Sequence, residues 1–157
     1  MMEITIDNPG QPDILALLAA SDAYVATLYP AESNHMLDVA ALQRPEVTFI
    51  VARANGRAVG CGAVVSSGDS CAEIKRMFVS PAARGQKLGR RLLEKLETIA
   101  ADNGATLLRL ETGVKQHEAL LLYRSAGFIE TGPFGQYGPD PLSVFMEKTL
   151  TAHVRRE

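Results

Sequence analysis

The chain has 157 residues, of which 46% are hydrophobic and 22% are charged, a composition typical of one globular domain. Sixteen lysines and arginines against eighteen aspartates and glutamates give a net charge of −2, which argues against a nucleic-acid partner that requires phosphate neutralisation. No apolar run approaches the ~18 residues that cross a bilayer, and the first residues do not resemble a signal peptide, so we expect a cytoplasmic protein with no membrane partner.

The first third of the chain predicts one strand and two helices. Met2–Ile6 alternates between apolar and polar residues, as a strand does, and a turn follows it. Pro12 suits the first turn of a helix that we expect to continue over residues 14–28. A second short helix is expected at 36–43. It ends before Pro45, because the residue before a proline avoids the helical conformation.

The middle of the chain predicts a hairpin, a third strand and an amphipathic helix. Residues 47–54 and 57–65 are rich in β-branched side chains, and Asn55-Gly56 between them is the pair that best suits a two-residue hairpin turn. Residues 71–79 predict the next strand of that sheet. Apolar residues then recur with helical spacing over residues 88–103.

The last third predicts shorter elements. We expect a strand at 106–111, a helix at 116–126 that ends at Gly127, and strands at 128–131 and 143–148 on either side of a Gly/Pro-rich loop. The element order is therefore βααβββαβαββ, an α/β (α+β) fold. We expect a single domain over residues 1–150 followed by a polar tail at 151–157. The two cysteines lack the spacing of metal ligands, and we expect no metal site.

Positive charge is concentrated between residues 73 and 91, where six basic residues and one acidic residue give a net charge of +5. This segment spans the end of a predicted strand and the start of a helix, where backbone N–H groups that the helix cannot satisfy point at one spot. Gly85 and Gly89 let the backbone approach an anion closely, and the neighbouring cations add positive potential. The sequence favours phosphate binding here; the alternative is a glycine-rich turn before a solvated basic helix face.

Two motifs resemble the GNAT family of N-acetyltransferases. Residues 77–93 are similar to its acyl-CoA-binding signature, Gln/Arg-x-x-Gly-x-Gly/Ala before a helix, with Arg84 and Gly89 in the outer positions and Lys87 where the family usually has its middle glycine. Residues 122–128, Leu-Tyr-Arg-Ser-Ala-Gly-Phe, are similar to the family's Leu-Tyr-x-x-x-Gly-Phe. The resemblance implies a mixed, mostly antiparallel sheet of about seven strands with helices on both faces.

The resemblance also implies that acetyl-CoA is the acyl donor and that no metal takes part. The family's fourth and fifth strands splay apart, so the backbone of Met77, Phe78 and Val79 is expected to bind the pantetheine arm as a strand binds an extended partner. Gln116 occupies a position often held by an asparagine that touches this arm. The pyrophosphate is expected to lie against the loop formed by Arg84, Gly85, Gln86, Lys87, Leu88, Gly89 and Arg90.

Transfer to an amine needs a base, because an amine that resembles lysine has a pKa of about 10 and arrives as ammonium. Glu73 and Glu111 match the positions of bases proposed in two groups of this family, and either can act through water. Tyr123 is expected to protonate the departing thiolate, since its family counterpart lies beside the sulfur. The alternative roles are structural: an ion pair with Lys75, Arg76 or Arg109 for either glutamate, and core packing for Tyr123.

The alternation of a β-strand makes a further prediction about residues 71–79. It places Glu73, Lys75, Met77 and Val79 on one face of the strand, and Ile74, Arg76 and Phe78 on the other.

The sequence indicates fewer residues of the acceptor site than of the cofactor site. The segments 29–37 and 132–142 fall where the family lines its acceptor side, and they contain the candidate contacts Tyr29, Glu32, His35, Phe134 and Tyr137. Lys75 is a further candidate, because a cation near the reacting centre can bind an acceptor carboxylate.

The sequence therefore predicts an N-acetyltransferase that acts by direct attack in a ternary complex. Its acceptor is expected to be the primary amine of a small molecule, amino-acid-like or polyamine, or of a peptide. The alternative is a non-catalytic acyl-CoA-binding sensor or accessory module. A homodimer is a further expectation, since family members often pair through sheet edges or last strands.

Overall fold

A seven-stranded sheet runs through the protein in the computed structural model, which describes residues 2–33 and 37–150. The strand order is β1-β2-β3-β4-β5-β7-β6, and all neighbours are antiparallel except β4 and β5. The strands are β1 (Met2–Ile6), β2 (Val47–Ala54), β3 (Arg57–Ser66), β4 (Cys71–Val79), β5 (Leu107–Gly113), β6 (Ile129–Thr131) and β7 (Ser143–Thr149). The predicted mixed, mostly antiparallel sheet is thus confirmed.

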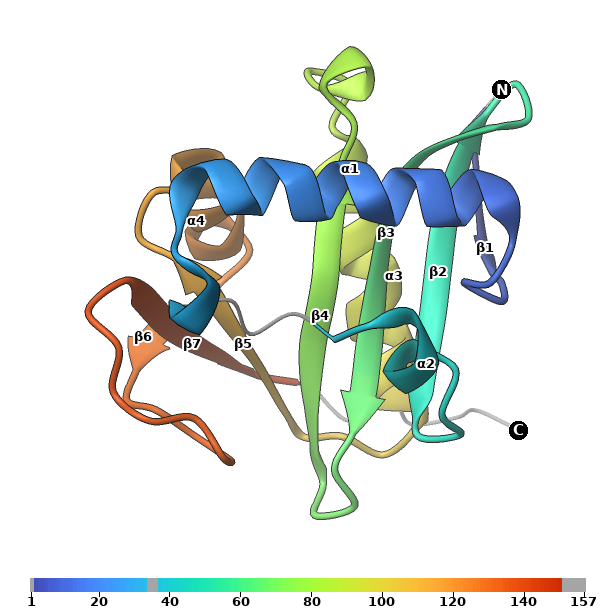
Figure 1. The fold of residues 1–157 in the computed structure, drawn as a ribbon. Helices are drawn as coiled ribbons and strands as arrows, with labels where there is room; N and C mark the ends of the chain where they lie inside the picture. Colours follow the sequence, from blue (N-terminus) through green and yellow to red (C-terminus); the bar gives the residue numbers. More distant parts are fainter. Residues whose placement is uncertain (1, 34–36, 151–157) are drawn as a thin grey trace, which may run out of the picture.

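Helices cover both faces of this sheet, as expected (Figure 1). α1 and α2 lie across one face, and α3 packs on the other, where it shares a core with residues of α4. Within residues 2–33 and 37–150, no helix is long and apolar enough to cross a membrane. The helices are α1 (Pro12–Leu28), α2 (Val39–Leu42), α3 (Leu88–Asp102) and α4 (His117–Ser125), with two 3₁₀ turns, η1 (Ala31–Ser33) and η2 (Pro81–Ala83).

The predicted boundaries agree with these elements to within a few residues. The hairpin turn between β2 and β3 has positive φ at both Asn55 and Gly56, 50° and 82°, as its sequence indicates. The two 3₁₀ turns were not predicted, because segments this short carry little pattern. The expected start of the second helix and the tail at 151–157 fall outside the described residues.

A bulge interrupts β4 near its middle. Lys75 and Phe78 face residues that are two apart in β3, so Arg76 and Met77 stand together opposite Gly62 alone. Arg76 has a φ of 59°, in the left-handed region. A β-bulge of this kind adds one residue to a strand and shifts the following side chains to the other face.

The bulge makes the predicted alternation of β4 wrong. Ile74 and Met77 pack with the core under α3, whereas Phe78 packs with the core under α1. Lys75 pairs with Ala63, which also belongs to the α1-side core, so Lys75 and Met77 point to opposite faces. The adjacent pairs Lys75-Arg76 and Met77-Phe78 interrupt the polar–apolar alternation of the sequence at the bulge, and this was the available signal.

The sheet opens between β4 and β5 beyond the bulge. These strands pair over only four positions, from Cys71 with Leu107 to Ile74 with Leu110. Past that point they diverge, as Figure 1 shows, and the rest of β4 faces no strand on this side. The splay expected from the family resemblance is therefore present.

The close packing of α3 on β3 generates a stability prediction. A Cβ on Gly60 would lie 3.1 Å from Leu92 Cδ1, 3.2 Å from Leu88 Cδ2 and 3.3 Å from the carbonyl oxygen of Phe78. Gly60→Val is therefore expected to lower the free energy of unfolding by roughly 1–3 kcal/mol, measured by urea denaturation. Gly132→Val is the control, since a Cβ there meets nothing within 4 Å, and equal losses in the two variants would contradict this account of the helix–sheet contact.

Candidate active site

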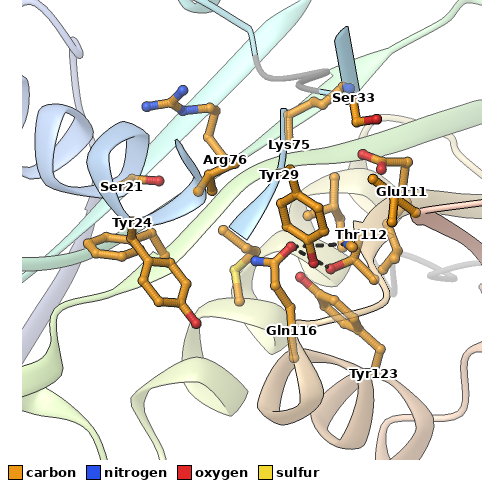
Figure 2. Close-up of a pocket in the computed structure, with 18 residues that line it drawn as sticks. Ser21, Tyr24, Tyr29, Ser33, Lys75, Arg76, Glu111, Thr112, Gln116 and Tyr123 are labelled. Atoms are coloured by element: carbon orange, nitrogen blue, oxygen red, sulfur yellow. Dashed lines mark hydrogen bonds between the residues drawn. The ribbon is translucent and has the colours of Figure 1, made fainter. Parts of the chain in front are cut away.

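Two cavities meet where β4 and β5 diverge. The larger, of about 590 Å³, lies between the end of β4, the loop that leads into α3, and α4. The smaller, of about 100 Å³, lies between the second half of α1 and the ends of β4 and β5 (Figure 2). The residues that line both cavities are Tyr24, Met77, Phe78, Gln116, Ala119 and Tyr123.

The loop from Arg84 to Arg90 forms one end of the larger cavity. Gly85 and Lys87 have positive φ values of 85° and 58°, and α3 begins at the next residue, Leu88. Positive φ at alternate residues before a helix N-terminus is typical of a concavity in which backbone N–H groups bind an anion. Lys87 thus adopts a backbone conformation suited to the glycine that the family usually has there, and its side chain is exposed.

Two arginines of this loop are held by neighbouring helices. The guanidinium of Arg84 lies 5.6 Å from the ring centroid of Tyr24 on α1. Arg90 Nη2 donates to Ser125 Oγ at the end of α4, at 2.5 Å. Both side chains line the larger cavity, so its positive charge is positioned by contacts with α1 and α4.

Gly89 has a packing role in addition to the one expected from the sequence. A Cβ on Gly89 would lie 3.1 Å from Leu122 Cδ2, so the missing side chain lets α3 and α4 approach each other. The missing side chain thus favours close helix packing, and Gly89 also lines the larger cavity, so its expected approach to an anion stays a prediction.

Tyr123 lies at the junction of the two cavities and is buried, with 5% of its surface exposed. Its ring packs edge-on against Phe128 at 5.8 Å, and its hydroxyl end points toward Tyr29, Thr112 and Gln116 in Figure 2. Burial, and to a lesser extent the charge of Glu111, raises the pKa of Tyr123 above its ordinary value. The phenol therefore stays protonated through neutral and mildly alkaline pH.

The two candidate bases have different surroundings. Glu111 lines the smaller cavity and accepts a hydrogen bond from Ser143 Oγ at 2.7 Å. Glu73 lies in the paired part of β4, where it accepts from Tyr137 Oη at 2.5 Å and forms an ion pair with Lys75 Nζ at 3.1 Å. Glu73 is absent from the described residues that line the two cavities. Its alternative structural role, the ion pair with Lys75, is present.

An aromatic group holds Lys75 on the face of the sheet beside the smaller cavity. Tyr137 and Phe134, from the loop before β7, pack edge-to-face with each other and with Phe145 at centroid distances of 5.2–5.7 Å. Lys75 Nζ donates to Tyr137 Oη, and burial, followed by the hydrogen bond to Glu73, raises the pKa of Tyr137. Among the described residues of this group, only Lys75 lines the cavity. Phe134 and Tyr137 therefore act on the site through their contacts with Lys75 and with each other.

Gln116 is fixed by the turn between β5 and α4. Its Oε1 accepts from the backbone N–H of Gly113 at 3.0 Å and from Thr112 Oγ1 at 3.3 Å. Because both bonds engage the oxygen, the amide nitrogen is directed the other way, at the junction of the two cavities.

The structure also adds residues that the sequence analysis missed. Tyr24 lines both cavities, and Lys115 and His117 line the larger one. The sequence signal for Tyr24 is its spacing: it follows Leu17 by seven residues and Ser21 by three, so it continues the face of α1 that packs on the sheet. Of the expected acceptor contacts, Tyr29 lines the smaller cavity, whereas His35 and the side chain of Glu32 lie outside the described part of the chain.

Comparison with known proteins agrees with this geometry. Residues 16–128 match the model of the acetyltransferase (GNAT) family. The chain belongs to the GNAT family. A relative from Azospirillum brasilense, named IAA acetyltransferase, is 50% identical over 153 residues, which cover 96% of this chain and 100% of the relative. YsnE from Bacillus subtilis, an uncharacterized N-acetyltransferase, is 34% identical over 95% of this chain and 100% of its own length.

Solved GNAT structures share the fold. A Klebsiella pneumoniae protein described as an acyl-CoA N-acyltransferase is 41% identical and superposes with a TM-score of 0.82, over 96% of this chain and 99% of the other. The PaiA N-acetyltransferase of Thermoplasma acidophilum, solved with coenzyme A, superposes with a TM-score of 0.74 over 95% of this chain and 99% of its own, and its 18% identity shows the fold alone. The protein is therefore a GNAT acetyltransferase with acetyl-CoA as its donor.

The left-handed conformation of Lys87 generates a prediction with a matched pair of variants. Lys87→Gly and Lys87→Ala remove the same charge, but only glycine relieves the backbone strain of a positive φ. The glycine variant is expected to be more stable than the alanine variant by roughly 1 kcal/mol in urea denaturation. Both are expected to bind CoA about 3-fold to 10-fold more weakly by calorimetry, through the lost charge. Equal stability of the two variants would show that residue 87 is unstrained.

Proposed function

We propose that this enzyme transfers the acetyl group of acetyl-CoA to the primary amine of a small, amino-acid-like molecule or of a peptide end. The observation that carries the proposal is the meeting of the two cavities at Tyr123, in the gap between β4 and β5. The larger cavity suits an extended, anionic donor, and the smaller one suits the amine.

The residues around the larger cavity fit acetyl-CoA, which supplies an activated acyl group as a thioester. Arg84, Lys87 and the N-terminus of α3 provide positive charge for the pyrophosphate. Met77, Phe78 and Val79 lie beyond the paired part of β4 and line the larger cavity, where their backbone can bind the amides of the pantetheine arm. Gln116 offers its amide nitrogen at the junction.

We assign the base to Glu111 in preference to Glu73. Glu111 lines the smaller cavity, where the ammonium group enters, and it stands near Tyr123. Glu73 is engaged by Lys75 and Tyr137. Glu111 therefore takes a proton from the amine, directly or through a water molecule, and the lone pair of the nitrogen becomes free to attack.

Tyr123 is assigned as the proton donor to the departing thiolate. Its raised pKa keeps the phenol protonated, and its hydroxyl opens toward the junction of the cavities. A buried phenol in this state can donate one proton to a sulfur anion and recover it from solvent after the product leaves.

The cations beside the smaller cavity favour an acceptor that carries a carboxylate. Lys75 lines this cavity, and Arg76, which also lines it, forms an ion pair with Asp22 at 2.7 Å. A carboxylate near the reacting amine would be stabilised by Lys75, whereas a polyamine would bring only further positive charge. This supports amino-acid-like acceptors over polyamines.

The test is release of free thiol from acetyl-CoA across a panel of amino acids, amino-acid-like compounds, polyamines, peptides with free N-termini, and IAA, the compound in the name of the Azospirillum relative. Turnover is expected with an amine that carries a carboxylate. Good turnover of polyamines and none of amino acids would contradict the assigned acceptor class. Calorimetric binding of acetyl-CoA without turnover on any amine would instead support the non-catalytic sensor.

Removal of the Tyr123 hydroxyl tests the proposed acid. Tyr123→Phe keeps the ring against Phe128 and is expected to lower kcat about 100-fold or more, with the Kd for acetyl-CoA nearly unchanged. Because the pKa of Tyr123 is raised, the variant should keep the wild-type shape of its pH profile below pH ~10. Full activity of the phenylalanine variant would remove Tyr123 from the mechanism.

Separate changes of the two glutamates test the proposed base. Glu111→Gln is expected to lower kcat about 100-fold and to abolish the loss of rate that protonation of the base causes at acid pH. Glu73→Gln is expected to change kcat by less than about fivefold, because a partly exposed ion pair contributes roughly 1 kcal/mol or less. The opposite pattern would identify Glu73 as the base.

A further inference from the structure

Tyr29, the residue that follows α1, is held rigidly at one end of the smaller cavity. Its ring lies directly against Gly113 at the end of β5: a Cβ on Gly113 would lie 1.9 Å from Tyr29 Oη and 2.1 Å from Cζ. Only glycine leaves room for the ring there. Tyr29 is 9% exposed, and burial raises the pKa of its hydroxyl.

The turn between β5 and α4 holds the same ring from its hydroxyl end. Tyr29 Oη accepts from the backbone N–H of Lys115 at 2.9 Å. Lys115 Nζ donates to the carbonyl oxygen of Leu28, the last residue of α1, at 3.2 Å. The hydroxyl end of the ring is therefore held both by close packing on Gly113 and by the bond from Lys115, and a ligand would have to disrupt both to displace it.

Tyr29 stands on the acceptor side of the junction. It lines the smaller cavity and not the larger one, whereas Tyr123 lines both. In Figure 2 the hydroxyl of Tyr29 lies next to the amide of Gln116, beyond Tyr123. A group that passes from the larger cavity past Tyr123 into the smaller one meets the ring of Tyr29.

The space in front of Tyr29 is small. The smaller cavity measures about 100 Å³, against about 590 Å³ for the larger one. Because the acceptor amine also enters the smaller cavity, little of this volume remains for the acyl group. A butyryl chain extends two carbons further from the thioester than acetyl does, toward the ring of Tyr29.

We propose that Tyr29, clamped over Gly113, limits the acyl donor to short chains and so makes the enzyme selective for acetyl-CoA. The inference rests on the proposed function, because it takes the smaller cavity to hold the acyl group and the amine together. The selectivity comes from a rigid wall, since the ring is fixed by contacts on two sides.

The test compares kcat/KM for acetyl-CoA, propionyl-CoA, butyryl-CoA and hexanoyl-CoA with one accepted amine. The wild-type enzyme is expected to prefer acetyl-CoA over butyryl-CoA by about 10-fold or more, the range of one or two methylenes in a closed pocket. Tyr29→Leu shortens the side chain while keeping it apolar, and is expected to reduce this preference about 10-fold. Calorimetric Kd values for the two thioesters, measured without any amine, should shift in the same direction.

Two control variants separate the wall from other effects. Tyr29→Phe keeps the ring and loses only the bond from Lys115, so it should retain the wild-type preference. Leu28→Ala shortens the neighbouring side chain, which is outside the lining of both cavities, and should also retain it. Circular dichroism shows whether each variant is folded.

The outcomes distinguish this inference from the proposed function. If wild-type enzyme uses butyryl-CoA as well as acetyl-CoA, or if folded Tyr29→Leu keeps the wild-type preference, Tyr29 does not limit the chain and the acetyltransferase assignment stands. If acetyl-CoA is bound but no amine is acetylated, the proposed function fails, and the calorimetric series alone decides whether Tyr29 limits the chain. The wild-type series needs no variant, so it can contradict the inference even if Tyr29→Leu does not fold.

Discussion

Pairing between β4 and β5 ends after Ile74 and Leu110, and the candidate active site lies beyond that point. A parallel pair that continued to the strand ends would use the backbone groups of β4 for ladder hydrogen bonds and leave no space for a ligand. Because the strands diverge, both cavities open in the same gap. The divergence thus supplies the volume of both cavities and brings the end of β4 into their lining.

α1 and Tyr29, the residue that follows it, contact the strands on both sides of the gap. On the β4 side, Arg76 binds Asp22 and the carbonyl oxygen of Leu18. On the β5 side, Tyr29 lies against Gly113. The bulge in β4 is what turns Arg76 toward α1, since a regular strand would alternate past it. α1 and Tyr29 therefore contact both strands at the end where their pairing has stopped.

Much of the architecture follows from local sequence. The Asn55-Gly56 turn, the spacing of apolar residues in α3 and the Gly127 stop of α4 each depend on backbone preferences and short-range periodicity, which act within a few residues of chain. The loop from Arg84 to Arg90 could be predicted for the same reason, because it consists of consecutive residues at a strand-to-helix turn, and phosphate binding there stays a prediction. The two motifs that resemble the GNAT family are also continuous segments.

The sequence by itself determined the element order, and its two motifs indicated the family and, through the resemblance, the mixed sheet. Only the tertiary structure decided the bulge at Arg76, the separate environments of Glu73 and Glu111, the packing role of Gly89 and the position of Tyr29 over Gly113. Each of these depends on residues far apart in the chain, such as Glu73 with Tyr137. Local preference cannot specify such contacts, because they form only when the strands and helices have packed into one structure.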